Sequence, residues 1–369
     1  MEQKRLGDIA TYINGYAFKP EDRGSTGLPI IRIQDLTGNA YDLGFYDGKY
    51  PEKIEINDGD VLISWSASLG VYIWNRGKGL LNQHIFKVVF DKCEVNKQYF
   101  VFAVKYKLKE MELKTHGATM KHIVKKDFDN TVIPFPTVEK QADIAYILSK
   151  IESIVEFRKQ ELQQLDDLIK ARFVEMFGDC NNMISMSEIC SIITDGTHQP
   201  PKFQETGIPF IFVSNLANNT VTYNAEKFIS KETYNELYKR TPIEPGDLLL
   251  STVGSYGHPA VVVEDTKFLF QRHIAYLKPK KEIINSFYLH SALLSSDCQR
   301  QIEEKVKGIA QKTLNLSEIR KIMIPVPNIE AQNVFVDFIY QVDKSKVAVQ
   351  KALDETQLLF DSLMQEYFG

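Results

Sequence analysis

The stretch Ile133–Pro136 (IPFP) recurs 191 residues later as Ile324–Pro327 (IPVP). The same offset of 191 holds without a gap from Gly117, which meets Gly308, as far as the end of each copy. Upstream of these glycines the copies still match, at offsets that drift from 180 to 189, because surface loops tolerate changes in length. The period is far too long for a solenoid, so we interpret the chain as a tandem duplication of a domain and a following segment.

Three pairs of upstream motifs support the duplication and predict its strands. They are Gly27–Ile31 (GLPII) with Gly207–Ile211 (GIPFI), Ile56–Ser64 (INDGDVLIS) with Ile243–Ser251 (IEPGDLLLS), and Asn82–Ile85 (NQHI) with Gln271–Ile274 (QRHI). In the middle pair, an Asp-Gly or Pro-Gly turn precedes a short apolar run, 61–64 or 248–251, which is typical of a turn followed by a strand. We predict further strands at 85–90 and 274–277, and helices at 96–112 and 286–307.

Each copy ends in a segment that we predict to be one long helix. The first starts after Pro134 and Pro136, which cannot lie inside a helix, and stops at Gly178. Its apolar residues, like those of the second copy, follow the alternating four-three spacing of a coiled coil. They are Ile144, Leu148, Ile151, Val155, Leu162, Leu165, Ile169 and Met176, and then Phe335, Ile339, Val342, Val349, Leu353, Phe360, Leu363 and Tyr367. Neither helix can bury its stripe alone, so we expect the two to pack on each other antiparallel.

These patterns predict an α+β fold with two tandem α/β domains, separated by two long helices that form an antiparallel coiled coil. The domain bounds that we expect are 1–136, 137–178, 179–327 and 328–369. At about 1.5 Å per residue each helix would be roughly 60 Å long. A helix pair of this length would act as a rigid spacer between the two α/β domains.

The composition indicates an intracellular globular protein. No apolar run is long enough to span a bilayer, and the polar, charged residues 1–9 do not resemble a secretory signal. The four cysteines, Cys93, Cys180, Cys190 and Cys298, are scattered and form no C-x-x-C pair. This spacing argues against a zinc site or a disulfide framework and favours reduced thiols in the cytoplasm.

Positive charge is concentrated outside the two predicted long helices. The formal net charge is −4, but the helices carry −2 and −4, so the remainder carries about +2. The window 105–126 holds seven lysines against two glutamates, and the window 300–321 holds six lysines and arginines against three. The two windows lie in register around Gly117 and Gly308. Because DNA backbone contacts need lysines and flexible amides, the repeated windows predict phosphate binding, although a solvated lysine-rich face gives the same pattern.

Motifs for catalysis are missing from the sequence. There is no P-loop and no dinucleotide fingerprint, and Gly254–Gly257 (GSYG) is not a nucleophile elbow around Ser255. His84 and His273 occupy matching positions beside strands, where we expect a shared structural hydrogen bond rather than metal ligation, because no ligand lies at suitable spacing. The segment 195–198 (DGTH) is interpreted as a polar turn, with His198 as a candidate partner contact. We therefore expect no catalytic and no metal-binding residues.

The candidate DNA contacts come from the basic windows and from polar loops that match between the copies, which ordinary turns would also explain. They are Lys19, Ser66, Ser68, Lys114, His116, Thr119, Lys121, His122, Thr197, His198, Lys202, Ser255, Tyr256, Lys305, Lys307, Gln311 and Lys312.

Several motifs, in order, resemble the specificity subunit of type I restriction–modification systems. In the second copy they are 195–198 (DGTH), 246–249 (GDLL), 272–275 (RHIA), 308–316 (GIAQKTLNL), 324–327 (IPVP) and 330–332 (EAQ). In the first copy they are 14–19 (NGYAFK), 59–64 (GDVLIS) and 133–136 (IPFP). The first copy departs at 118–121 (ATMK), which lacks the equivalent of Gln311.

The resemblance covers essentially the whole chain and implies a non-catalytic DNA reader. It implies two target-recognition domains, each reading half of a split double-stranded DNA target, with the long helices as a spacer. It also implies two modification subunits docked on this chain and restriction subunits in a larger complex. S-adenosylmethionine, ATP and Mg²⁺ would then be bound by those partners and not by this chain.

Three alternatives remain open at this point. The same reader module could serve another DNA modification system. A duplicated protein-binding adaptor would bind its partner without salt dependence and leave no DNA footprint. An enzyme with an unfamiliar site would need a cleft with strongly perturbed pKa values.

Overall fold

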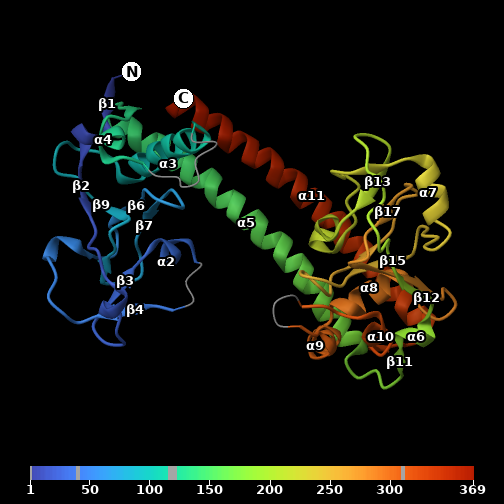
Figure 1. Ribbon diagram of the computed structural model, residues 1–369. Coiled ribbons are helices and arrows are strands. Elements are labelled where there is room, and N and C mark those ends of the chain that lie inside the picture. The colour runs from blue at the N-terminus through green and yellow to red at the C-terminus, as the bar shows by residue number, and fades with distance from the viewer. Residues whose placement is uncertain (1, 39–41, 115–122, 309–311) are drawn as a thin grey trace. The chain divides into compact units, whose positions relative to one another are not determined.

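The computed structural model describes residues 2–38, 42–114, 123–308 and 312–369 (Figure 1). The chain divides into two compact units: unit 1 comprises residues 1–159 and 351–369, and unit 2 comprises residues 160–350. Two helices of 40 residues, α5 (Val138–Phe177) and α11 (Ile329–Phe368), pass from one unit into the other, so each unit contains about half of each helix. Their bounds lie within one residue of those expected from the proline and glycine signals. The four domain bounds given above stay a prediction, because the units divide the helices.

Unit 1 is built on two four-stranded sheets with the orders β2-β9-β6-β7 and β4-β3-β8-β5. The first sheet is antiparallel throughout, whereas β3 and β8 of the second run parallel. The strands are β1 (Gln3–Arg5), β2 (Thr11–Asn14), β3 (Leu28–Ile31), β4 (Gly44–Tyr46), β5 (Glu55–Ile56), β6 (Val61–Ser64), β7 (Gly70–Ile73), β8 (Gly79–Leu81), β9 (Ile85–Val89) and β10 (Val132–Pro134). The helices of this unit, besides its parts of α5 and α11, are α1 (Leu6–Ile9), α2 (Ile33–Thr37), α3 (Lys97–Lys114) and α4 (Lys125–Asp129), with short 3-10 turns at Pro20–Asp22 and Glu52–Ile54.

Unit 2 repeats this plan with the sheets β12-β18-β15-β16 and β14-β13-β17. Its strands are β11 (Met183–Ser185), β12 (Cys190–Asp195), β13 (Ile208–Ile211), β14 (Phe228–Ile229), β15 (Leu248–Ser251), β16 (Pro259–Val261), β17 (Leu269–Phe270), β18 (Ile274–Pro279) and β19 (Met323–Pro325). Its helices, besides its parts of α5 and α11, are α6 (Met186–Ile189), the 3-10 helix η3 (Val213–Asn219), α7 (Lys231–Leu237), α8 (Ser286–Leu294), α9 (Ser296–Lys305) and α10 (Leu316–Ile319). The strands predicted at 61–64 and 248–251 are therefore confirmed as β6 and β15, which lie inside their sheets and are buried throughout.

The Gly-Asp pairs before β6 and β15 have a structural role. Asp60 accepts a hydrogen bond from the Asn57 backbone N–H (2.8 Å), and Asp247 accepts one from that of Glu244 (3.0 Å). Asp247 also accepts a bond from the Tyr276 hydroxyl at 2.9 Å. Burial raises the pKa of the Asp247 carboxyl group, and these hydrogen bonds act in the opposite direction. The motif thus closes the turn that aligns the central strand of each unit.

Each unit also ties the start of its long-helix segment to a neighbouring helix through a buried glutamine. The Gln141 side chain accepts from the Asn96 N–H (2.9 Å) and donates to the Pro136 carbonyl (2.8 Å). Gln332 makes the same two contacts, with the Asn285 N–H (2.8 Å) and the Pro327 carbonyl (2.9 Å). Both side chains are fully buried, so their amides satisfy backbone groups that water cannot reach.

Within each unit, the two long helices run antiparallel. In unit 1, the early residues Ile144 and Leu148 share a hydrophobic core with the late residue Phe360. In unit 2, the late residue Phe173 of α5 shares a core with the early residue Phe335 of α11. The Lys346 ammonium group lies 2.6 Å from the Asp166 carboxylate and joins the two helices in unit 2.

The predicted coiled-coil seam is wrong at the ends of the helices. Met176, Leu363 and Tyr367 are only half-buried, whereas the neighbouring pairs Phe173/Phe177 and Met364/Phe368 are buried. The reason is that these ends pack into the cores of the units as well as on the other helix. An α-helix repeats every 3.6 residues, so a stripe counted at 3.5 drifts out of phase. Midway along the helices, Leu162, Leu165, Ile169, Val349 and Leu353 are half-buried.

The single helix predicted at 286–307 is also wrong, because the structure has two. α8 ends before Ser295, whose extended backbone (φ −63°, ψ 151°) breaks the helix. The Ser295 hydroxyl then accepts a hydrogen bond from the Cys298 N–H and caps α9. Serine is a favoured N-cap, and here this local signal is stronger than the continuous helical pattern.

Candidate DNA interface

The loops that follow the central strands β6 and β15 have the same hydrogen-bonding pattern. We call them the central loops: residues 65–69 in unit 1 and 252–258 in unit 2. The Trp65 N–H donates to the His84 carbonyl (3.3 Å), and the Thr252 N–H donates to that of His273 (3.0 Å). The Trp65 carbonyl accepts from the Ile123 N–H (3.0 Å), just as the Thr252 carbonyl accepts from that of Leu314 (2.8 Å). In both units, therefore, the chain returns from a basic window to the central loop.

Both central loops contain a residue with a left-handed backbone at the same position. Ala67 has φ +58° and its equivalent Gly254 has φ +74°. Glycine adopts this conformation readily, whereas a residue with a Cβ pays a steric cost. The loop geometry is therefore retained in unit 1 at some cost in stability, as is common at binding sites.

A polar groove of about 570 Å³ lies beside the central loop of unit 2. Its lining residues come from the end of β12, the central loop, the two residues before β18 and the stretch before and into α10. They are Asp195, Thr252, Val253, Arg272, His273, Thr313, Leu314, Asn315, Leu316 and Ser317. The lining offers hydroxyl, amide and guanidinium donors, the groups that contact phosphates and base edges in DNA.

Charged and titratable groups in this groove are arranged around Asp195 and Arg272. The Asp195 carboxylate binds the Arg240 guanidinium (2.7 Å) and the His198 imidazole (2.9 Å). The His273 Nε2 atom accepts a hydrogen bond from Arg272 Nε at 3.3 Å. Burial, and then the charge of Arg272, lower the pKa of His273, so that its imidazole is neutral near pH 7. The Asp195 carboxylate is thus paired with Arg240 and His198, while the Arg272 side chain is exposed.

The expected structural hydrogen bond of His84 and His273 has a simple form. His84 Nε2 lies 3.3 Å from the Gln83 amide, as His273 lies beside Arg272. Each imidazole is therefore held by the side chain of the preceding residue. No cluster of three histidine, cysteine, aspartate or glutamate side chains suited to a metal ion occurs within residues 2–38, 42–114, 123–308 and 312–369. Over the same described ranges, no helix is long and apolar enough to cross a membrane.

The basic segment of unit 2 contacts the central loop directly. The Gly254 N–H donates to the Lys312 carbonyl (3.2 Å), and the Lys312 ammonium group lies 6.0 Å from the centre of the Tyr256 ring. Lys312 and Ser255 are exposed. Lys307, in contrast, lies 3.8 Å from the Glu318 carboxylate, which partly neutralises it. The structure thus brings Ser255, Tyr256 and Lys312 together.

The other predicted contacts are more scattered. Lys202 is exposed, Thr197 and Lys305 are half-exposed, and Lys305 ends α9. In unit 1, Lys19 is exposed and 3.9 Å from Glu21. Ser68 is exposed, but Ser66 is only 9% exposed, which argues against a direct contact. Lys114 is the last residue of α3. Predictions for His116, Thr119, Lys121, His122 and Gln311 lie outside the described residues.

Several residues that line the groove or bind Asp195 were not predicted from the sequence. Arg272 and Asn315 lie within motifs that match between copies or with the family, and their chemical type suits DNA contacts, so a signal was present. Arg240 carries no such signal, because it is far in sequence from Asp195 and only the fold brings the two together.

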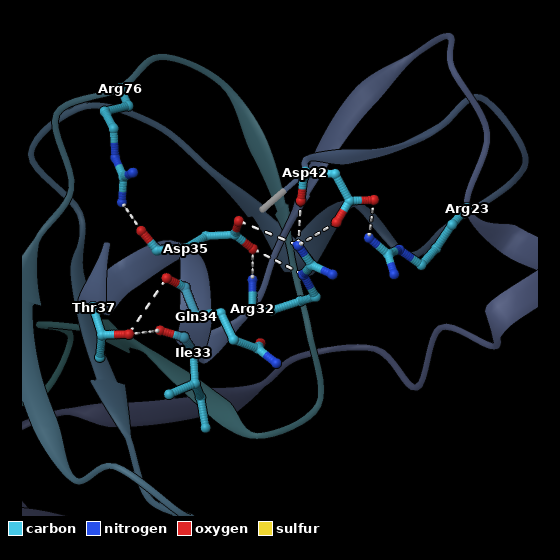
Figure 2. A network of polar contacts seen from close by, with 8 residues as sticks. All are labelled: Arg23, Arg32, Ile33, Gln34, Asp35, Thr37, Asp42 and Arg76. Atoms are coloured by element: carbon cyan, nitrogen blue, oxygen red, sulfur yellow. Dashed lines mark hydrogen bonds and ion pairs between the residues drawn. The ribbon is translucent and has the colours of Figure 1, made fainter. Parts of the chain in front are cut away.

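Unit 1 has a charged network where the chain leaves β3 (Figure 2). The Asp35 carboxylate is 2% exposed and accepts bonds from the Arg32 N–H (2.8 Å) and guanidinium (3.0 Å). The Arg76 guanidinium donates to the Asp35 carbonyl. The equivalent residue of unit 2 is Asn215, whose side chain accepts from the Phe212 N–H at 3.0 Å. The turn is conserved between the units, but its chemistry changes from charged in unit 1 to neutral in unit 2.

The fold and these equivalent loops define a chain with two copies of one recognition domain joined by paired helices. Residues 1–167 and 181–356 match the family described as type I restriction modification DNA specificity domain. The chain belongs to this family.

Two relatives match nearly the whole chain. The type I restriction enzyme EcoBI specificity subunit of Escherichia coli is 27% identical, over 98% of this chain and 84% of that protein. The type I restriction enzyme MjaVIII specificity subunit of Methanocaldococcus jannaschii is 22% identical, over 95% of this chain and 89% of that protein.

Solved structures share the fold. The S subunit of a type I restriction–modification system from M. genitalium has a TM-score of 0.54 at 15% identity, covering 100% of this chain and 96% of that one. A chain solved in work on complex assembly and conformational transition of the type I R-M system has a TM-score of 0.59 at 17% identity, covering 99% and 97%.

Proposed function

We propose that this chain is the DNA-specificity subunit of a type I restriction–modification complex. Each unit reads one half of a bipartite double-stranded target, and the paired helices set the distance between the two halves. The alternative of a protein-binding adaptor is less favoured, because membership of the DNA specificity family covers both copies.

One observation carries the proposal: both copies keep the same central loop, tied by equivalent hydrogen bonds to a segment that returns from a basic window. The need for a stable fold is enough to explain why both copies retain the same strand order. Retaining the loop geometry even at Ala67, against its steric preference, favours a shared binding role. Lysines of the windows would contact phosphates, and polar loop residues would contact bases.

The chemistry of modification and cleavage belongs to partner subunits in this proposal. Two modification subunits dock on this chain and bind S-adenosylmethionine, and restriction subunits bind ATP and Mg²⁺. This chain itself is non-catalytic and binds no cofactor. The absence of nucleophile and phosphate-binding motifs from the sequence supports this division, as does the name of specificity subunit carried by its relatives.

The test is to co-express the chain with a modification subunit and to sequence the methylated sites of the host DNA. We expect one bipartite motif with a fixed gap. Methylation should disappear when this chain is omitted. A motif that is unchanged without this chain would exclude the role of specificity subunit.

A further inference from the structure

The segments that follow β3 and β13 share two features, although the first is the α-helix α2 and the second is the 3-10 helix η3. Asp35 and Asn215 accept equivalent backbone hydrogen bonds, and three residues later both chains reach a left-handed residue. This residue is Gly38 in unit 1 (φ +75°) and Asn218 in unit 2 (φ +58°). No atom lies within 4 Å of the position that a Cβ would take on Gly38. A side chain would therefore fit at this position in unit 1, where the turn is made by glycine, and unit 2 carries an exposed asparagine there.

The backbone beside Asn218 is fixed by two histidines. The Asn219 carbonyl accepts a hydrogen bond from His290 Nε2 (3.1 Å), and its side-chain oxygen lies 3.1 Å from His258 Nδ1. Asn219 is also left-handed, with φ +58°. Two consecutive left-handed residues, the second held by neighbouring side chains, give Asn218 a defined position, which a base-reading side chain needs.

Asn218 also lies at the candidate interface. It lines a groove of about 370 Å³ together with His258 and Ser255 of the central loop. The neighbouring residues of that loop, Thr252 and Val253, line the polar groove described above. The loop therefore has Asn218 on one side and the phosphate-binding candidate Lys312 in contact with Gly254.

We propose that Asn218 reads an A·T base pair in the half-site of unit 2, through the N6 and N7 atoms of adenine. A carboxamide offers one donor and one acceptor side by side, which matches adenine in the major groove. In unit 1 the equivalent Gly38 has no side chain, so that half-site is read by other groups. This inference rests on the proposed function and adds a specificity-determining residue to it.

The direct experiment uses the full chain in complex with modification subunits and a random pool of DNA duplexes. The variant Asn218→Gly keeps the backbone that Gly38 adopts and removes only the side chain. We expect it to fold with a Tm close to that of the wild type, because glycine adopts the left-handed backbone readily. One adenine of the unit 2 half-site should become degenerate, with a fall in affinity for the original site of about 5- to 150-fold. The unit 1 half-site is the internal control and should not change.

A second arm uses one defined duplex in which that adenine is replaced by 7-deazaadenine, which lacks the N7 acceptor. The wild-type complex should lose affinity, whereas the Asn218→Gly complex should be indifferent. If the variant selects the same bases as the wild type, the base-reading role is wrong although the proposed function stands. If the wild-type complex selects no bipartite site, the proposed function fails, and this inference fails with it.

Discussion

Ala67 and Gly254 occupy the same position of the two central loops and share a left-handed backbone, with φ +58° and +74°. This pair gives opposite expectations for two substitutions. Ala67→Gly should stabilise the protein by about 0.5–1 kcal/mol, because relief of steric strain exceeds the entropy lost by glycine. Gly254→Ala should destabilise it by about 1 kcal/mol, although the space around its Cβ is open.

Urea unfolding of both variants checks this expectation. Ala171→Gly on the exposed face of α5 is the matched control, and there glycine should destabilise by about 1 kcal/mol. Equal effects of Ala67→Gly and Ala171→Gly would contradict a left-handed requirement at residue 67.

The buried glutamines offer a second test. Gln332→Ala removes the partner of the Asn285 N–H and of two carbonyl groups, those of Ile283 and Pro327. Because these groups are shielded from water, we expect a loss of roughly 2–3 kcal/mol in the free energy of unfolding. Gln141→Ala removes the two equivalent bonds and should cost somewhat less. Thermal unfolding measures whether Gln332→Ala destabilises the protein more than Gln141→Ala does. A negligible effect of Gln332→Ala would show that water replaces the amide.

Sequence periodicity predicted both long helices, local turn signals predicted the central strands, and motifs repeated at a constant offset of 191 predicted the duplication. Periodicity predicted the seam at the helix ends wrongly, since Phe177 and Phe368 are selected by the cores of the units rather than by the spacing along one helix. The break at Ser295 was missed because capping competes with helical periodicity. For the candidate site, Lys312 and Tyr256 were predicted, but the partnership of Asp195 with Arg240 depends on residues that only folding brings together.

Phosphate binding by the basic windows leads to a third prediction. Lys312→Ala, and Lys121→Ala at the equivalent position of the sequence, should weaken DNA binding without changing the preferred bases. Each loss of one phosphate contact should reduce the slope of log K against log salt by about 0.9. Lys344→Ala is the control, because Lys344 is an exposed lysine of α11 that lies outside both basic windows. A slope that stays unchanged in both main variants, measured by DNA titration at several salt concentrations, would exclude this role.

The helix pair gives the fourth prediction, because its two 40-residue helices are matched without a gap. We would insert one heptad after Glu161 and one after Ala352, which preserves the four-three phase. At about 1.5 Å per residue the recognition domains should separate by about 10 Å. That distance is roughly three base pairs at about 3.4 Å each. A one-residue insertion should instead break the seam and destabilise the protein.

The spacer role of the helices is tested most directly by selecting preferred sites from a random DNA pool with this heptad variant, with modification subunits present. We expect the two original half-sites, separated by about three additional base pairs. Affinity should fall, because the added pairs rotate the duplex by about a quarter turn or slightly more at roughly 10.5 base pairs per turn. A stably folded variant that keeps the original spacing, or that selects new half-site bases, would contradict the claim that two readers are held apart by the helices.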